Sequence, residues 1–182
     1  GEYNVPKDVP VLYIGNHRSY FDILITYIRV PRPTGYIAKK EMLRYPLLSN
    51  WMKNLHCLFL DRKDIKQGLK TILTAIEKVK SGISICIFPE GTRNRVNDTF
   101  MEFHEGSFKI AEKTGCPIIP MSINNSAQIF EDHIPKIKKA HVVLEYGKPI
   151  YPAELSKEER KHLGVYTQNI IKETYFKNKE LV

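Results

Sequence analysis

The hydrophobic and polar positions of the chain fall into two alternating patterns. Short apolar runs rich in β-branched and aromatic residues, bounded by turn-forming residues, are typical of strands. Longer segments with apolar residues at every third or fourth position are typical of helices that cover a sheet. These patterns predict strands at residues 10–14, 35–39, 57–61, 83–88, 117–123 and 141–147. They predict helices at residues 20–30, 46–55, 64–80, 107–115 and 156–179.

Capping residues mark the ends of some of these helices. Asp64 can accept a backbone hydrogen bond where the third helix begins, and Gly82 can end that helix in a left-handed conformation. Ser156 and Glu159 have the spacing of a capping box at the start of the last helix. Gly164 lies inside this last helix and weakens the prediction that it is continuous.

The order of strands and helices predicts an α/β fold with a largely parallel central sheet flanked by helices. The fourth predicted strand, 83–88, is apolar without interruption, as expected of a strand that is buried on both faces. No repeat or linker interrupts the pattern, and 182 residues are ordinary for one domain. We therefore expect residues 1–182 to form a single domain.

Composition adds a strong positive charge to this picture. Apolar residues make up 42% and charged residues 26% of the chain, a balance typical of globular proteins, and the formal net charge is +8. This excess favours an anionic partner, which could be a nucleic acid, a phosphorylated substrate or an anionic membrane surface. No apolar run approaches the length of about eighteen residues that a membrane span needs.

Metal and nucleotide chemistry have little support in the sequence. The three cysteines, Cys57, Cys86 and Cys116, are far apart and lie in apolar segments, so we interpret them as reduced core residues. There is no CxxC pair, and the histidines other than His17 lack partners at ligand spacing. Neither a Walker A nor a GxGxxG motif is present. We expect neither a metal nor a bound cofactor.

The segment NHRSYFD, residues 16–22, follows the first predicted strand and allows two interpretations. Ser19 and Asp22 have the spacing of a capping box, in which Asp22 would only bind backbone N–H groups at a helix start. Alternatively, Asp22 could bind one imidazole nitrogen of His17 and leave the other free to act as a base. No serine lies in a G-x-S-x-G segment, so the hydroxyl to be activated would belong to the substrate.

The segment FPEGTRNR, residues 88–95, follows the fourth predicted strand and is also polar. Gly91 permits a tight turn, and Arg93 and Arg95 can each bind a phosphate through two N–H groups. Glu90 could orient an arginine or accept a hydrogen bond from a substrate hydroxyl. The alternative interpretation is a solvated loop with one salt bridge.

Two further cations, Lys39 and Arg62, lie at the ends of other predicted strands. Each one alone is typical of an exposed surface charge. Because ligand sites of parallel sheets form beyond the carboxyl ends of the strands, these cations and the 88–95 loop could together form a phosphate pocket.

At this point the chain resembles the PlsC-like glycerolipid acyltransferases, the 1-acyl-glycerol-3-phosphate acyltransferase family. NHRSYFD resembles the family's NHxxxxD block, and FPEGTRNR its FPEGTR block. YIAKKEMLRYPLLSNWMKNLHCLFLDR resembles the second block, CPIIPMSI the late proline-rich block, and FHEGSFKIAEKTG the segment between the last two. The resemblance runs from about Val9 to Ile123 and continues more weakly to the C-terminal helix.

The resemblance implies acyl transfer from acyl-CoA or acyl carrier protein to the free hydroxyl of 1-acyl-glycerol 3-phosphate (lysophosphatidic acid), giving phosphatidic acid. His17 would be the general base and Asp22 its orienting residue, with direct attack on the thioester and no acyl-enzyme. The positions implied for phosphate binding are Lys39, Arg62, Glu90, Gly91, Thr92 and Arg93. The resemblance also implies an enzyme at an anionic membrane surface, on its cytoplasmic face, that does not bind nucleic acid.

Two departures from the family leave alternatives open. Ser49 and His56 stand where small glycines are common in the second block, which leaves acceptor choice and the shape of an acyl tunnel undecided. We also expect the family's N-terminal hydrophobic or amphipathic segment to lie outside this chain. The alternatives are an acyltransferase for another lysophospholipid, a lyso-aminolipid or glycerol 3-phosphate, or a non-catalytic basic module that binds membrane or nucleic acid.

Overall fold

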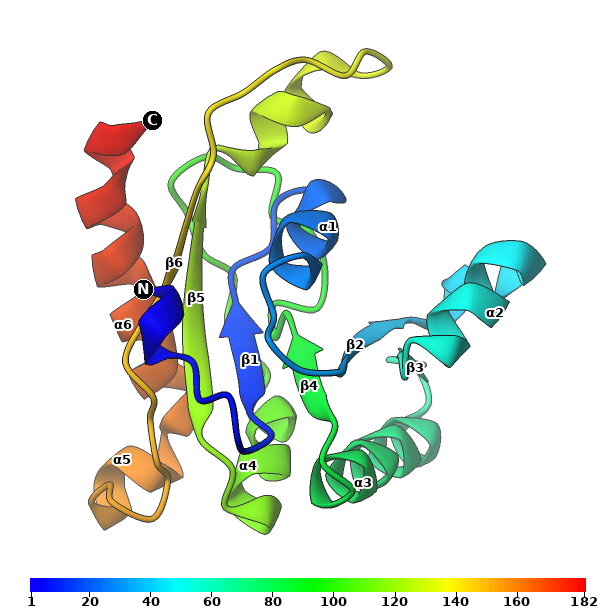
Figure 1. Cartoon of the computed structure of the whole chain (residues 1–182), viewed down its shortest axis with the longest axis vertical. Coiled ribbons are helices and arrows are strands. Elements are labelled where there is room, and N and C mark those ends of the chain that lie inside the picture. Colours follow the sequence, from blue (N-terminus) through cyan, green and yellow to red (C-terminus); the bar gives the residue numbers. More distant parts are fainter.

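The computed structural model describes all 182 residues and has a six-stranded sheet at its centre (Figure 1). The strands are β1 (Leu12–Gly15), β2 (Thr34–Lys39), β3 (Leu58–Leu60), β4 (Ser84–Ile87), β5 (Ile118–Asn124) and β6 (Val143–Tyr146). Their order is β3-β2-β4-β1-β5-β6, and every pair is parallel except β5 with β6, which is antiparallel. The predicted α/β class with a largely parallel sheet is confirmed.

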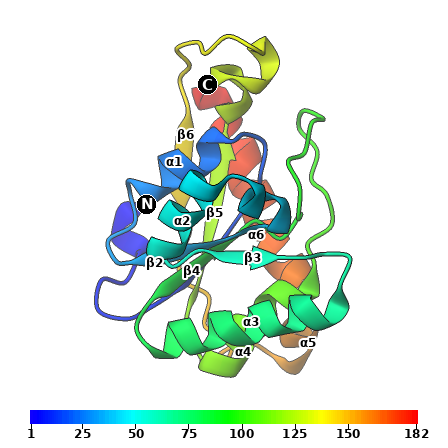
Figure 2. The ribbon, with the colours of Figure 1, turned by 90° about the vertical axis from the view of Figure 1, so that its right-hand side faces the viewer.

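Helices lie on both faces of this sheet, and one projects from its edge. They are α1 (Phe21–Tyr27), α2 (Pro46–Asn54), α3 (Ile65–Lys80), α4 (Lys109–Thr114), α5 (Lys157–Lys161) and α6 (Leu163–Asn178). Apolar residues of α3, α4 and α6 form one core against the sheet, while α1 and the N-terminal segment pack on the opposite face. The turned view shows α1 and α2 toward the viewer, with α6 behind the sheet (Figure 2).

Strand β4 shows how the apolar pattern determines these two cores. Ile85 and Ile87 point into the core under α3 and α4, whereas Cys86 and Phe88 point into the core on the opposite face. All four residues of β4 are buried, as predicted from its uninterrupted apolar run. Because successive side chains of a strand point to opposite faces, such a run can only be a central strand.

The prediction of one continuous C-terminal helix is wrong. The capping box of Ser156 and Glu159 is present, but α5 ends at His162, whose backbone leaves helical geometry (φ −120°, ψ 40°). Gly164 lies inside α6, where its N–H donates to the carboxylate of Glu105 at 3.1 Å. A Cβ at this position would lie 2.6 Å from a Glu105 oxygen, so the glycine permits the close approach of the carboxylate.

The backbone conformation at His56 explains why a glycine would suit this position. Its φ is +61°, a left-handed conformation that costs little for glycine and more for other residues. Its carbonyl oxygen packs against Gly35 of β2, where a Cβ would come within 2.2 Å. Ser49, the other departure from the family pattern, is buried, and its hydroxyl donates to the carbonyl of Pro46.

The other predictions for single residues are largely confirmed. The Asp64 side chain accepts from the backbone N–H of Gln67 and caps α3. All three cysteines are free; Cys86 and Cys116 are buried in the cores, while Cys57 is half-buried. None of the helices combines the length and the apolar character needed to cross a membrane.

Candidate active site

Two polar loops meet at the carboxyl edge of the sheet. Strands β1 and β4 are parallel neighbours, so the segments that follow them, residues 16–22 and 88–95, leave the sheet side by side. Both segments therefore lie at the same edge of the sheet. Asn16 anchors the first loop, because its side-chain amide exchanges two hydrogen bonds of 2.9 Å with the backbone of Ile123 in β5.

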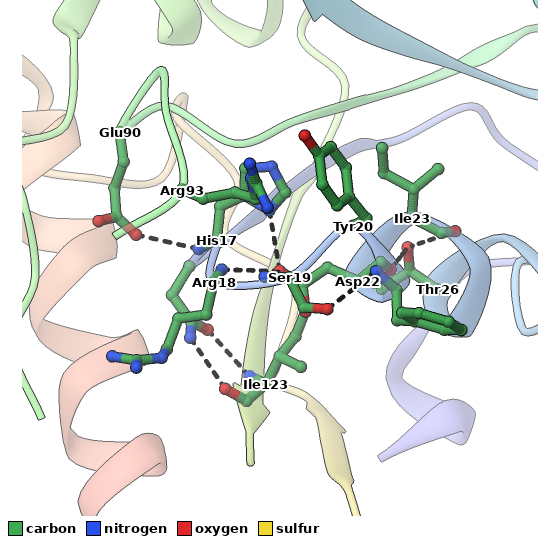
Figure 3. Close-up of polar contacts among 12 residues, drawn as sticks. His17, Arg18, Ser19, Tyr20, Asp22, Ile23, Thr26, Glu90, Arg93 and Ile123 are labelled. Carbon is green, nitrogen blue, oxygen red and sulfur yellow. Dashed lines mark hydrogen bonds and ion pairs between the residues drawn. The ribbon is translucent and has the colours of Figure 1, made fainter. Parts of the chain in front are cut away.

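The second loop fixes the backbone of His17 from both sides. The His17 N–H donates to Glu90 Oε1 at 3.0 Å (Figure 3). The His17 carbonyl accepts from the Asn94 N–H at 2.7 Å. The side chain of Asn94 is buried and binds the backbone of Val96 and Thr99, which folds the loop back on itself. The position of the histidine is therefore set by residues that follow it by more than seventy positions.

The imidazole of His17 is held by a buried carboxylate. Its Nδ1 lies 2.8 Å from Asp22 Oδ2, and Asp22 is fully buried (Figure 3). The ring stacks on Phe88 with centroids 4.4 Å apart. Nδ1–H donates to the carboxylate, which fixes the tautomer, and Nε2 makes no hydrogen bond within the protein. The free Nε2 can therefore accept a proton from a bound substrate.

Asp22 fulfils part of the capping interpretation as well. The same Oδ2 accepts from the backbone N–H groups of Arg18 at 2.7 Å and Ser19 at 2.8 Å. The reciprocal half of a capping box is missing, because the Ser19 hydroxyl accepts from Phe21 rather than from Asp22. One carboxylate oxygen thus orients the imidazole and stabilises the turn before α1, so the two interpretations are not exclusive.

Glu90 differs from the sequence-based expectation. It is buried, and its two oxygens accept from the backbone N–H groups of His17 and Met101, each at 3.0 Å. Burial raises the pKa of this carboxyl above its ordinary value. No arginine contacts it, so the idea that Glu90 orients an arginine is wrong. Its observed contacts hold the two loops together.

Arg93 is oriented by residues outside its own loop. Its Nη1 lies 2.9 Å from Glu131 Oε1, and its guanidinium carbon lies 3.6 Å from the centre of the Tyr20 ring (Figure 3). The same Glu131 oxygen accepts from the Tyr20 N–H at 2.8 Å. Sequence reasoning missed Glu131, which begins the short 3₁₀ helix η5 (Glu131–His133) after β5 and carries no motif. Arg95, by contrast, is exposed and makes no hydrogen bond within the protein.

The other predicted phosphate-site residues gather beside Arg93. Lys39 Nζ donates to Thr92 Oγ1 at 3.2 Å, and the Arg62 guanidinium packs against Gly91, whose φ is +74°. A Cβ at Gly91 would lie 3.1 Å from the Arg62 guanidinium carbon. Partial desolvation, followed by the charge of Arg62, lowers the pKa of Lys39. The charges of Arg62 and Arg93 both contribute to this lowering of the Lys39 pKa.

A groove of about 820 Å³ opens next to Arg62. One wall is the apolar face of α3, formed by Ile65, Leu69, Ile72, Leu73 and Ile76. The groove reaches Arg62, Gly91 and His104 at one end and includes Phe88, on which the His17 ring stacks. His104 was not singled out from the sequence. No group of side chains in the protein has the composition of a metal site.

Comparisons with known proteins agree with this geometry. The sequence model of the family described as Acyltransferase matches residues 1–124. The chain is 33% identical over 173 residues to the 1-acyl-sn-glycerol-3-phosphate acyltransferase of Borreliella burgdorferi, covering 94% of this chain and 69% of that protein. It is 30% identical over 187 residues to the probable 1-acyl-sn-glycerol-3-phosphate acyltransferase of Mycoplasma genitalium, covering 96% and 69%.

A solved structure shares the fold. The crystal structure of the 1-acyl-sn-glycerophosphate (LPA) acyltransferase, PlsC, from Thermotoga maritima superimposes with a TM-score of 0.83 at 29% identity, covering 97% of this chain and 69% of that one. The family model, these relatives and the paired His17 and Asp22 at the sheet edge agree, and the chain belongs to the acyltransferase family.

Proposed function

We propose that this chain transfers a fatty acyl group from acyl-CoA or acyl carrier protein to the free hydroxyl of 1-acyl-glycerol 3-phosphate, giving phosphatidic acid. The observation that carries the proposal is the His17 imidazole, tied through Nδ1 to a buried carboxylate while Nε2 is free. The names of the relatives support the choice of acceptor. The nearby cations supply a site for its phosphate.

His17 acts as the general base in this proposal. Nε2 takes the proton of the acceptor hydroxyl while the oxygen attacks the thioester carbonyl, so that a C–O bond forms and the C–S bond then breaks. The imidazolium returns the proton to the departing thiolate. Asp22 stabilises the transient positive charge and keeps the ring in place, as the carboxylate does in a Ser-His-Asp triad. The nucleophile is the substrate's own hydroxyl.

Arg93, Arg62 and Lys39 hold the phosphate of the acceptor in this proposal. A phosphate monoester carries close to two negative charges at neutral pH, and a guanidinium can bind two of its oxygens at once. The Nη1 of Arg93 is already occupied by Glu131, which leaves its other N–H groups for the ligand. Thr92 and the backbone around Gly91 line the same place, and the groove along α3 offers an apolar surface to an acyl chain.

The enzyme works at the cytoplasmic face of an anionic membrane in this proposal, because its acceptor is a lipid and its net charge is +8. It needs neither a metal nor a bound cofactor, since the acyl donor is a substrate. It has no role in nucleic-acid binding. Glycerol 3-phosphate, other lysophospholipids and lyso-aminolipids are the acceptors to be compared with 1-acyl-glycerol 3-phosphate.

Thiol release from acyl-CoA, measured with and without lysophosphatidic acid, tests the proposal. We expect release that depends on the acceptor in the wild type, its loss in His17→Ala, and its retention in His141→Ala. His141 is an exposed histidine whose side chain makes no hydrogen bond, which makes it a matched control. Release that needs no acceptor, or that survives His17→Ala unchanged, contradicts the proposal. The same assay across the alternative acceptors identifies the preferred one.

A further inference from the structure

A short arm stands away from the sheet next to the candidate site. It consists of the 3₁₀ turn η2 (Lys40–Arg44) and the helix α2, residues 40–54, and we call it the η2–α2 arm. Figures 1 and 2 show α2 projecting from the β2–β3 edge rather than lying on a face of the sheet. The arm begins directly after Lys39, whose side chain donates to Thr92. We call Lys39, Arg62 and Arg93, the cations proposed to hold the acceptor phosphate, the phosphate cluster.

The arm exposes large apolar side chains in a cluster. Leu47 is 90% exposed and Trp51 53% exposed. Leu43, Tyr45 and Leu48 are exposed as well. Because Leu47 and Leu48 lie four and three positions before Trp51, these side chains share one face of α2. The buried residues of α2, Ser49 and Met52, lie toward another side of the helix, so the protein itself does not cover the apolar face.

Such a face indicates a partner. Single exposed apolar residues are ordinary, but a cluster of leucine, tyrosine and tryptophan on one projecting element marks an interaction surface. The shape also limits the kind of partner, since the surface is a convex helix and not a groove that could hold a peptide. A convex apolar element suits a partner into which it can insert, such as the apolar part of a lipid bilayer.

The charges on the arm identify that medium. The arm carries three basic residues, Lys40, Arg44 and Lys53, against one acidic residue, Glu41. Lys40 pairs with Asp61 at 3.0 Å, while Arg44 and Lys53 form no salt bridge within the protein. Apolar residues with flanking Lys and Arg, together with Trp and Tyr, are the composition of helices that lie in the interface of anionic bilayers.

We propose that the η2–α2 arm inserts its apolar face into the interface of an anionic lipid bilayer. Leu47, Leu48 and Trp51 enter the acyl boundary, and Arg44 and Lys53 contact the lipid head groups. This inference deepens the proposed function and rests on it for its purpose: the arm brings the phosphate cluster to the surface from which a lysophospholipid acceptor would come. The insertion itself can be measured without any turnover.

Trp51 makes that measurement direct, because it is the only tryptophan in the chain. We expect its emission to shift to the blue when vesicles of phosphatidylcholine and phosphatidylglycerol are added, and to be quenched by brominated acyl chains. Vesicles of phosphatidylcholine alone should bind less. If the chain floats with vesicles while the Trp51 emission does not change, another surface binds the lipid and the inference is wrong. A shift that follows protein concentration without lipid indicates a second copy and also overturns it.

Two pairs of variants test the residues and leave the probe in place. Leu47→Gln with Leu48→Gln should lower partitioning onto vesicles by at least about tenfold. The control Val165→Gln removes an exposed apolar residue from α6, on the far side of the sheet, and should change nothing. Arg44→Gln with Lys53→Gln should cost about fivefold per residue. Lys157→Gln with Lys161→Gln removes the same net charge from α5 and should have a much smaller effect.

Activity separates this inference from the proposed function. The Leu47→Gln, Leu48→Gln variant should acylate a short-chain, water-soluble lysophosphatidic acid as the wild type does, yet lose activity on vesicle-embedded acceptor. If the wild type acylates neither acceptor, the proposed function fails while the binding result still decides the role of the arm. If the variant binds vesicles as tightly as the wild type does, the inference fails regardless of activity.

Discussion

Two hydrogen-bonded pairs, each built on one carboxylate, organise the candidate site, and they differ in almost every respect. His17 and Asp22 come from one turn, five positions apart, and Asp22 is fully buried. Arg93 and Glu131 come from segments 38 positions apart, and both side chains keep some exposure to solvent. The distances are nearly the same, 2.8 Å and 2.9 Å.

The difference lies in how each acid is used. Asp22 Oδ2 accepts three hydrogen bonds, from the imidazole and from two backbone N–H groups, so the histidine is fixed by the turn itself. Glu131 Oε1 accepts from Arg93 and from the Tyr20 N–H, so it links the long Arg93 side chain to the start of α1. In the proposed mechanism the first pair holds the group that reacts, whereas the second holds one that binds the acceptor phosphate.

Breaking the first pair should give the largest effect. His17→Ala removes the base and should lower turnover by about a hundred- to ten-thousand-fold while the protein stays folded. Asp22→Asn should cost as much or somewhat less, because an amide no longer fixes the tautomer or stabilises the imidazolium. Turnover and the melting temperature should be measured together. Full activity with a lowered melting temperature in Asp22→Asn would leave only the helix-start role for this carboxylate.

Removing the arginine of the second pair should come next. Arg93→Ala should lower kcat/KM for lysophosphatidic acid, and the corresponding loss of transition-state stabilisation should be about 2–5 kcal/mol. This is the range for truncating one side of a buried charged pair. Arg93→Lys should also be poor, because lysine keeps the charge but not the planar fork. The kcat/KM for monoacylglycerol, which has no phosphate, should fall much less. An equal loss with both acceptors would mean that Arg93 supports the loop or the thioester instead of the phosphate.

Changing the acid of the second pair should have a smaller effect that appears in KM. Glu131→Gln keeps an acceptor for the Tyr20 N–H but loses the charge that orients Arg93, so KM for lysophosphatidic acid should rise by roughly tenfold, or about 1.5 kcal/mol. The value of kcat should change little. Glu145→Gln, which breaks the 2.8 Å pair with Lys177 away from the site, is the matched control. A lower melting temperature with an unchanged KM would assign Glu131 a purely structural role.

The same contrast explains what the sequence could predict. His17 and Asp22 lie within one short segment, and the contact that the structure shows was one of the two interpretations that their spacing allowed. The apolar run of β4 was enough to predict that this strand is buried on both faces, as it is. Glu131 reaches the site only through the fold, and no local pattern marks it; His104 lies in a family-like segment, but nothing in that segment singles it out. The break at His162 was missed because the helical pattern continues through it while the backbone does not.

Glu90 shows that a sequence motif does not give the direction of a side chain. Its place in FPEGTRNR suggested a group that faces an arginine or a substrate, because the sequence cannot show which way a side chain points. In the structure both oxygens accept backbone N–H groups and tie Met101 to His17. A motif residue can therefore serve a site by holding its backbone, which spacing alone does not distinguish from direct contact.

Replacing the cysteines should have the smallest effect on rate and isolates His17 and Asp22 as the reacting pair. Cys86 lies on β4, two positions before Phe88, but it is buried, and burial raises the pKa of its thiol far above neutrality. Burial raises the pKa values of the Cys57 and Cys116 thiols as well, so none offers a ready thiolate. The triple replacement by Ala should therefore keep a measurable rate, at some cost in stability from the cavities left in the cores.

Single-turnover reactions with labelled acyl-CoA should show product without labelled protein. An acylated cysteine that forms and decays at the rate of turnover would replace direct attack with a two-step mechanism, and His17 would then act on a thiol instead of on the substrate hydroxyl.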